Sequence, residues 1–411
     1  MIKRIIALLL ALCCWQGGAL ADGVQFRFTM EESEVLSEGA LRALGQRLEQ
    51  AYLVLDTAQD KQLSALYYDD APLIVAAADA QSAVLTAEGL TVPVERTDFS
   101  LQKIISQALD KAQMLGQALS AYEKSAKATA ELGGVVKAKT QLSYALSKEQ
   151  WAEIWPQVCD ILGERFAAYT TESKGTLRRY FDAEGSEIGA YFYAEKVRVG
   201  ENDVREVRLE YGYQQAKGLY LSFRCPNKNE TRNTRISLTA KRTERTDRIS
   251  YAVNGDIRLK HAAGQDTLLI ESTLKEQEGI FSGKATLNYT QKRGEQSVKH
   301  ALTIKPEVAL GSLSGVIKIV YDRAGQNVAT GTLTLSAAQA GEISIPAVNA
   351  SQEQLTEALA RRLVYSLLDI APEDRLELMY YLNRSLFLTG DEKEIYLMYD
   401  PEFMVMEEPE E

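Results

Sequence analysis

Residues 187–226 read EIGAYFYAEKVRVGENDVREVRLEYGYQQAKGLYLSFRCP, a stretch in which apolar and polar side chains repeatedly alternate. Alternation with a period of two places successive side chains on opposite faces of a β-strand. The pattern continues in both directions and forms about eleven segments between Lys174 and Ser336. These segments predict a large antiparallel sheet that has one apolar face and one charged face.

A sheet of this size rarely stays flat, because neighbouring strands twist relative to each other. We therefore expect it to curl, with its apolar face filled by side chains, by helices or by a ligand. Amphipathic helices that can cover this face are predicted at residues 99–129, 148–169, 351–369 and 372–388. The predicted fold class is α+β, a large curved, half-barrel-like antiparallel sheet covered by amphipathic helices. An outer-membrane barrel is not expected, since its charged face would meet lipid or its apolar face water.

Several helix ends carry local signals. Ser37 is expected to begin a helix that runs to about Gln50, and Gly133-Gly134 is expected to end the helix predicted at 99–129. Two capping boxes are present, namely Ser147 with Gln150 and Ser351 with Gln354.

The order of strand, helix, strand meander and helix occurs twice along the chain. This order predicts two related units joined near Gly133-Gly134. The smaller unit covers residues 22–132, and the larger, half-barrel-like unit covers residues 133–390. An acidic tail, residues 391–411, follows the second unit.

The first 21 residues have the pattern of a secretory signal peptide. Lys3 and Arg4 supply the positive charge, an apolar run follows, and Ala19-Leu20-Ala21 offers a cleavage site. The apolar run is shorter than a membrane span. Lipidation at Cys13 or Cys14 is disfavoured, because neither has a small residue before it. We expect a secreted or extracytoplasmic protein of the bacterial cell envelope.

The chain is acidic, with 46 basic and 57 acidic residues and a formal net charge of −11. Removing residues 1–21 takes away two basic residues and brings the charge to −13. Nucleic acids and anionic membrane surfaces attract positive patches, so we expect neither as a partner. No apolar run after residue 21 is long enough to cross a bilayer, so we also expect no integral membrane protein after cleavage. Acidic residues interrupt one basic run, which is interpreted as a solvated strand face with cross-strand ion pairs. That run consists of Lys241, Arg242, Arg245 and Arg248.

Cys159 and Cys225 are the two cysteines that remain after the predicted cleavage. In an exported chain they can form one disulfide or stay as two separately buried thiols, and the sequence leaves both alternatives open. A structural zinc site needs four ligands, and His261 and His300 are not at ligand spacing with these cysteines. We therefore expect no metal site and no cofactor.

The sequence carries no strong catalytic motif. Gly311-Ser312-Leu313-Ser314-Gly315 has its serines out of register with a nucleophile elbow, so it is interpreted as a turn. His300 lies in an alternating strand and is interpreted as a core or cross-strand histidine, while His261 begins a turn. We expect no catalytic residues, and the sequence does not indicate which residues bind a ligand.

A strand and a helix followed by a long meander, with helices left to cover its apolar face, resemble the half-barrel envelope proteins. These are the LolA-like lipoprotein carriers and their mycobacterial lipid-binding relatives. The resemblance implies a curved sheet around a hydrophobic cavity that holds acyl chains, and it covers element order alone. Leu66-Tyr67-Tyr68-Asp69-Asp70 and Lys148-Glu149-Gln150-Trp151 also resemble stretches of uncharacterised exported proteins of Gram-positive bacteria.

Three functions stay open on this interpretation. The first is a noncatalytic structural or protein-interaction module of the cell envelope. The alternative is a half-barrel binding protein for a lipid or another apolar envelope ligand, and an exported hydrolase is the third. The partners expected are accordingly a lipid or another cell-envelope protein. Whether the sheet encloses an open cavity or a packed core distinguishes these functions.

Overall fold

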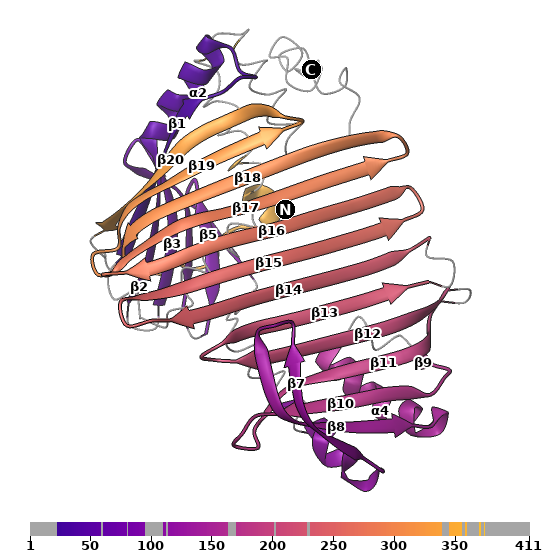
Figure 1. Cartoon of the computed structure of the whole chain (residues 1–411). Helices are drawn as coiled ribbons and strands as arrows, with labels where there is room; N and C mark the ends of the chain where they lie inside the picture. Colours follow the sequence, from indigo (N-terminus) through magenta and orange to yellow (C-terminus); the bar gives the residue numbers. More distant parts are fainter. Residues whose placement is uncertain are drawn as a thin grey trace. The chain divides into compact units, whose positions relative to one another are not determined.

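The structure is a computed structural model that describes most of the chain. The described residues are 23–58, 61–79, 81–94, 110–111, 114–162, 170–200, 203–227, 231–338, 345–355, 358–359, 370 and 374. The elements described in full are twenty β-strands, two α-helices and one short 3-10 helix (Figure 1), and residues 110–111, 114–118, 352–355 and 358–359 are also helical. The chain divides into two compact units. Unit 1 comprises the described residues between 98 and 305, and unit 2 those between 18 and 97 and from 306 onward.

Unit 1 is built on an antiparallel sheet. Its strands pair in the order β7, β8, β10, β11, β12, β13, β14, β15, β16 and β17, and the short β9 pairs with β11. The elements are η2 (Leu119–Ala121), β7 (Ser125–Leu132), β8 (Val136–Leu146), α4 (Lys148–Leu162), β9 (Thr170–Thr171), β10 (Gly175–Phe181), β11 (Glu187–Gly200), β12 (Asp203–Gln214), β13 (Gly218–Pro226), β14 (Asn233–Glu244), β15 (Arg248–His261), β16 (Gly264–Gln277) and β17 (Ile280–Arg293).

Unit 2 combines strands from both ends of the chain. Its strands pair in the order β19, β20, β1, β2, β3, β4, β5 and β6. The elements are β1 (Gly23–Glu32), α2 (Glu38–Gln50), β2 (Ala51–Ala58), β3 (Lys61–Tyr68), β4 (Ala71–Ala78), β5 (Ala83–Ala87), β6 (Leu90–Pro93), β19 (Ser314–Arg323) and β20 (Gln326–Ala338). The remaining strand, β18 (Gln296–Ala309), contains the boundary between the units.

Helix α4 begins where its capping box predicts. The Ser147 side chain accepts a hydrogen bond from the backbone N–H of Gln150, and the Gln150 side chain accepts one from the backbone N–H of Ser147. The helix presents apolar residues at helical spacing, and Trp151, Ile154 and Val158 are at most 2% exposed. They form one core cluster with the apolar face of strands β8 to β13. This cluster is the main core of unit 1.

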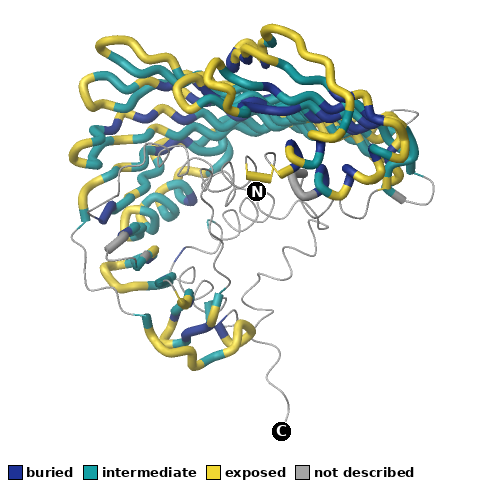
Figure 2. The backbone as a smooth tube through the Cα atoms, turned by 90° about the horizontal axis from the view of Figure 1, so that it is seen from below, coloured by how far each residue is buried: buried dark blue, intermediate teal, exposed yellow. Residues whose placement is uncertain are grey.

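Tight turns connect the strands, and they explain why most neighbours in the sheet are also neighbours in sequence. Gly133 and Gly134 have φ values of 58° and 71°, in the left-handed region that both central residues of this tight hairpin turn require. The backbone N–H of Val135 closes the turn with a 3.0 Å hydrogen bond to Leu132. In Figure 2 the turns are largely yellow, which marks them as exposed, while much of the strand length is teal or dark blue.

Much of the predicted local structure is confirmed. The eleven segments predicted between 174 and 336 are strands β10 to β20, and the meander predicted near the N-terminus is β2 to β6. Ser37 caps α2 by accepting a hydrogen bond from the backbone N–H of Ala40. The second capping box is also present, because Ser351 and Gln354 exchange the same two hydrogen bonds.

The predicted helix at 99–129 was wrong at its C-terminal end. Residues 125–132 form strand β7, which pairs with β8, and Gly133-Gly134 is the hairpin turn and not a helix cap. The segment is rich in alanine, which favours helices, but its alternation of alanine with polar residues suits a strand. Pairing with β8 decides the outcome. The helix predicted at 372–388 and the acidic tail lie outside the described residues, apart from residue 374.

The predicted fold class was also wrong. All twenty described strands belong to one antiparallel sheet, and the two described α-helices are short beside it. The protein is thus not an α+β fold in which helices cover a half-barrel-like sheet. The reason is that segments expected to cover the sheet, such as 125–132, join it as strands. The predicted division at 132/133 rests on element order, which the compact units do not test, and it stays a prediction.

Candidate anion-binding site

The sheet of unit 1 has an apolar face, against which α4 packs, and an opposite face that is mostly polar. Residues paired directly across neighbouring strands share a face, so the register assigns each residue to one. Leu177, Phe192 and Leu209 are paired in this way and belong to the core cluster that contains α4. The residues that alternate with them belong to the opposite face, which we call the polar face.

Four arginines lie in a row across the polar face, one on each of strands β12 to β15. Arg208 is paired with Arg224, and Arg224 is paired with Arg235. Arg235 is in turn paired with Arg258. Because neighbouring strands lie about 4.8 Å apart, the row spans roughly 14 Å. We call these four residues the arginine row, and Figure 1 shows the four neighbouring strands that carry it.

Carboxylates pair with the two ends of the arginine row. Nε of Arg208 lies 2.5 Å from a carboxylate oxygen of Glu206. Arg258 donates two hydrogen bonds of 2.8 Å to the carboxylate of Asp256. Within the described part of the chain, no hydrogen bond or ion pair joins the exposed Arg235 to another residue. The centre of the row therefore holds a guanidinium group that is available to a ligand.

The arginine row costs stability when nothing is bound to it. Like charges directly opposite each other on neighbouring strands destabilise a sheet. Glu206 pairs with Arg208 and Asp256 pairs with Arg258, so these two carboxylates act at the ends of the row. An anion between Arg224 and Arg235 would remove the repulsion at the centre. Guanidinium groups suit this task because their donors match carboxylate and phosphate oxygens in pairs.

A second polar row runs beside the first, two residues further along each strand. It consists of Glu210, Ser222, Ser237 and Asp256, each paired with the next. We call it the hydroxyl row, and it offers both hydrogen-bond donors and acceptors. Glu210 accepts hydrogen bonds from the hydroxyl groups of Tyr180, at 2.7 Å, and Tyr220, at 3.4 Å. These contacts fix the carboxylate of Glu210 at one end of the row.

Two tyrosines extend the rows onto strand β11. Tyr193 is paired with Arg208, and Tyr191 is paired with Glu210. The guanidinium carbon of Arg208 lies 5.0 Å from the centroid of the Tyr193 ring, and that of Arg178 lies 4.6 Å from the Tyr191 ring. These cation–π contacts hold the rings beside the rows.

The β7–β8 hairpin folds over the polar face next to the hydroxyl row (Figure 1). A Cβ atom on Gly133 would come within 2.2 Å of the Tyr220 ring, so the turn lies directly against that ring. A Cβ atom on Gly212 would come within 2.5 Å of the Leu132 side chain. The two glycines thus permit a close approach that places the hairpin as one border of the polar surface.

A groove of about 610 Å³ also opens beside this hairpin. Its charged lining residues are Lys137, Lys139, Lys217, Glu131, Asp182 and Glu184. Three cations and three carboxylates balance each other, so the groove does not select a ligand by net charge. The arginine row, by contrast, selects a ligand by its negative charge.

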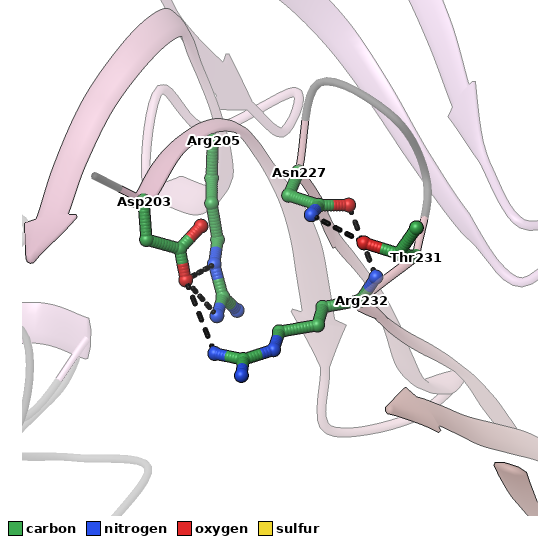
Figure 3. A network of polar contacts seen from close by, with 5 residues as sticks. All are labelled: Asp203, Arg205, Asn227, Thr231 and Arg232. Atoms are coloured by element: carbon green, nitrogen blue, oxygen red, sulfur yellow. Dashed lines mark hydrogen bonds and ion pairs between the residues drawn. The ribbon is translucent and has the colours of Figure 1, made fainter. Parts of the chain in front are cut away.

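A polar network on the apolar side closes the end of the core cluster (Figure 3). Arg205 donates hydrogen bonds of 3.1 and 2.6 Å to Asp203, and Arg232 lies 3.9 Å from the same carboxylate. The hydrogen bond from Arg205 holds the pKa of Asp203 below its ordinary value. Asn227 bonds to Thr231 and to the backbone of Arg232. Because its charges are turned toward one another, this network serves the fold.

A buried ion pair lies on the same side. Arg179 and Glu187 are 2.5 Å apart, and each side chain is 13% exposed. Burial raises the pKa of Glu187, although the nearby Arg179 opposes the shift. A Cβ atom on Gly116 would clash with the guanidinium group of Arg179, so the segment before η2 packs closely over the pair. The pair is enclosed by protein and does not face the arginine row.

The structure places the residues that the sequence singled out in separate environments. Cys159 and Cys225 are both buried in the same core cluster, and whether they pair or stay as separate thiols is still open. His300 lies 5.8 Å from the ring of Tyr289, and His261 lies 3.6 Å from Asp266. The stretch 311–315 joins β18 to β19 as predicted. In the basic run, Arg242 pairs with Glu244 along its own strand.

Sequence reasoning missed the arginine row, although a signal for it exists. Each of its members occupies a polar position in an alternating strand. The turn between Gln214 and Gly218 sets the register that brings Arg208 opposite Arg224. The register between β13 and β14 depends on where the longer connection after Pro226 ends, which the alternation does not reveal.

The described residues contain neither a cluster of metal-binding side chains nor a membrane-spanning helix. Among the described residues, no group of three or more His, Cys, Asp or Glu side chains is arranged to hold a metal ion. Across the same ranges, none of the helices is long and apolar enough to cross a bilayer.

Comparison with known proteins gives distant structural neighbours. No protein-family model and no curated protein matches the sequence. Among solved structures, a BenF-like porin from Pseudomonas fluorescens Pf-5 is similar at 6% identity, with a TM-score of 0.28, over 78% of this chain and 98% of that chain. OccK5 (OpdH) from Pseudomonas aeruginosa is similar at 7% identity, with a TM-score of 0.27, over 77% of this chain and 96% of that chain. At these TM-scores, no function is transferred from these proteins to this chain.

These findings correct the predicted family and the functions that followed from it. The twenty-stranded sheet is not the helix-covered half-barrel of the LolA-like carriers and their lipid-binding relatives, so the predicted family was wrong. Both the structural or protein-interaction module and the binding of an apolar ligand assumed a helix-covered half-barrel, which the twenty-stranded sheet replaces. The expected partners, a lipid or another envelope protein, were wrong for the same reason. The exclusion of an integral membrane protein is withdrawn with them, because it was drawn for a helix-covered half-barrel that the twenty-stranded sheet replaces.

Proposed function

We propose that this chain is an exported, noncatalytic binding protein whose arginine row binds an anionic ligand. The pairing of Arg224 with Arg235 carries the proposal, because it brings two positive charges together at the centre of the row. Export rests on the signal-peptide pattern of residues 1–21. Binding at the arginine row requires side chains that contact the ligand and no catalytic residue.

The ligand is anionic because the row repels itself without one. In a chain with a net charge of −11, four arginines side by side are a local reversal of the overall charge. Long-range attraction to an anion is weak in such a protein, so recognition depends on contacts at the row. Charge-assisted hydrogen bonds from guanidinium groups supply these contacts.

The direct test is a titration of the full chain with citrate and with inorganic phosphate at constant ionic strength. The shift in the protein's melting temperature measures binding. A ligand that binds the folded state raises the melting temperature in proportion to its affinity and concentration. We expect citrate to bind, and Arg235→Gln to weaken binding about tenfold or more, because a charge-assisted contact is lost.

Lys275→Gln is the matched control. Lys275 is exposed on the polar face of β16, opposite Ser250 of β15, and lies roughly 26 Å from the arginine row along the strands. It changes the net charge by the same amount as Arg235→Gln, so an effect of overall charge would appear in both variants. Equal losses in both variants, or unchanged citrate binding by Arg235→Gln, would overturn the proposal.

A further inference from the structure

The length of the arginine row says more about the ligand than its charge does. A small anion contacts two neighbouring arginines, whereas the row continues across four strands over roughly 14 Å. Its members repeat at the spacing of the strands. A ligand that uses the whole row must therefore carry several negative charges in a line, as a linear polymer does.

Carboxylates beside the row restrict the kind of polymer. Glu206, Glu210 and Asp256 all lie next to the arginines on the polar face. A densely charged phosphate chain, such as a nucleic acid, would be repelled by these groups along its length. A polymer of uronic acids carries one carboxylate on each sugar, and its hydroxyl groups can donate hydrogen bonds to the carboxylates.

The hydroxyl row fits the same ligand. Ser222 and Ser237 lie directly opposite each other, between the carboxylates of Glu210 and Asp256. Serine hydroxyls donate and accept hydrogen bonds, which matches the hydroxyl groups of a sugar. Tyr193 extends the arginine row with a ring surface that offers amphipathic contact area, whereas Tyr191 packs against the cluster of the β7–β8 hairpin. Charged and polar groups thus run in parallel across the same strands.

We propose that the arginine row and the hydroxyl row together bind a linear acidic polysaccharide of uronic acid units, which lies across strands β12 to β15. This inference rests on the proposed function, since it assigns a ligand class to the same anion site. Arg224 and Arg235 bind carboxylates at the centre, Arg208 and Arg258 extend the site, and Ser237 hydrogen-bonds to sugar hydroxyls.

The experiment measures binding of galacturonate oligomers, from the monomer to the octamer, to the full chain by calorimetry at constant ionic strength. We expect affinity to rise with length and then to level off when the row is filled. Methyl esterification of the carboxylates of the oligomer should abolish its binding to the protein. Ser237→Ala should weaken oligomer binding roughly threefold to tenfold, because it removes a hydrogen bond and no charge.

Arg258→Gln separates this inference from the proposed function. It removes one end of the row, so affinity should level off at a shorter oligomer than in the unmodified chain. If the monomer binds as tightly as the octamer while Arg235→Gln still weakens citrate binding, the polysaccharide is excluded and the anion site stands. If a linear polyphosphate of equal charge binds more tightly than the oligomer, the ligand class is wrong. If neither citrate nor any oligomer binds, both proposals fail.

Discussion

Arg224 on β13 and Arg235 on β14 lie directly opposite each other in the register of the sheet. Each has a further arginine on its other side, Arg208 and Arg258 respectively. The pairing is between like charges, so it does not contribute to the stability of the sheet. Residues that lower stability and face outward are typical of sites where a protein meets a ligand.

Replacing Arg235 by glutamine should therefore stabilise the protein in the absence of ligand. Relief of the repulsion from Arg224 and Arg258 is expected to raise the free energy of unfolding by about 0.2–1 kcal/mol at low salt. The gain should shrink as salt is added, because salt screens exposed charges. Urea unfolding at low and high sodium chloride measures it. Arg235→Lys keeps the charge and should show little gain, and a salt-independent loss of stability in Arg235→Gln would contradict this prediction.

The buried pair of Arg179 and Glu187 should make stability depend on pH. Burial raises the pKa of Glu187 above its ordinary value of 4.5, so the folded protein holds this proton more tightly than the unfolded chain. The resulting stabilisation is complete below the ordinary pKa and is lost as the pH rises through the raised one. Glu187→Gln should remove this slope from the urea-unfolding profile, and an unchanged slope would contradict the assignment.

Glu187→Leu, unlike the glutamine variant, also removes the oxygen atoms that accept hydrogen bonds from Arg179. Leaving the guanidinium group buried without an acceptor costs about 3–5 kcal/mol. The double variant Arg179→Met with Glu187→Leu replaces both charges by apolar groups and should recover most of that loss. A double variant as unstable as Glu187→Leu would show that packing around the pair, and not the isolated charge, sets the cost.

A side chain at Gly212 should displace the β7–β8 hairpin. Its Cβ atom would lie 2.5 Å from the Leu132 side chain, which is closer than two carbon atoms can approach. Gly212→Ala is expected to lower the free energy of unfolding by about 1–3 kcal/mol, as overpacking of a core does. Limited proteolysis should cut faster near Gly133. Gly311→Ala, in an exposed turn where a Cβ meets nothing within 4 Å and φ is not positive, is the control for glycine replacement.

The two cysteines should be unreactive in the folded protein and reactive after unfolding. Both thiols are buried, and burial raises the pKa of Cys225, which keeps it in the poorly nucleophilic thiol form. We expect a thiol reagent to label both in urea without reductant and neither beforehand. Labelling that requires a reductant would instead show the Cys159–Cys225 disulfide.

Local structure followed from the sequence wherever the signal lay within one element. Ser147 and Gln150 predicted the start of α4, and the two residues bond to each other as their spacing requires. The prediction failed at 125–132, where alanine favours a helix and only the partner strand β8 decides for a strand. The arginine row was missed for the same reason, because it exists only in the pairing of four strands.

The sequence by itself determined where strands β10 to β20 run and which of their residues alternate between faces, since period-two patterning is a property of each strand alone. Only the tertiary structure decided which strands become neighbours. Phe26 of β1 lies opposite Leu335 of β20, more than three hundred residues away, and nothing in either strand names the other. Backbone hydrogen bonds are the same for every sequence, so burial and packing of the whole sheet select the partners.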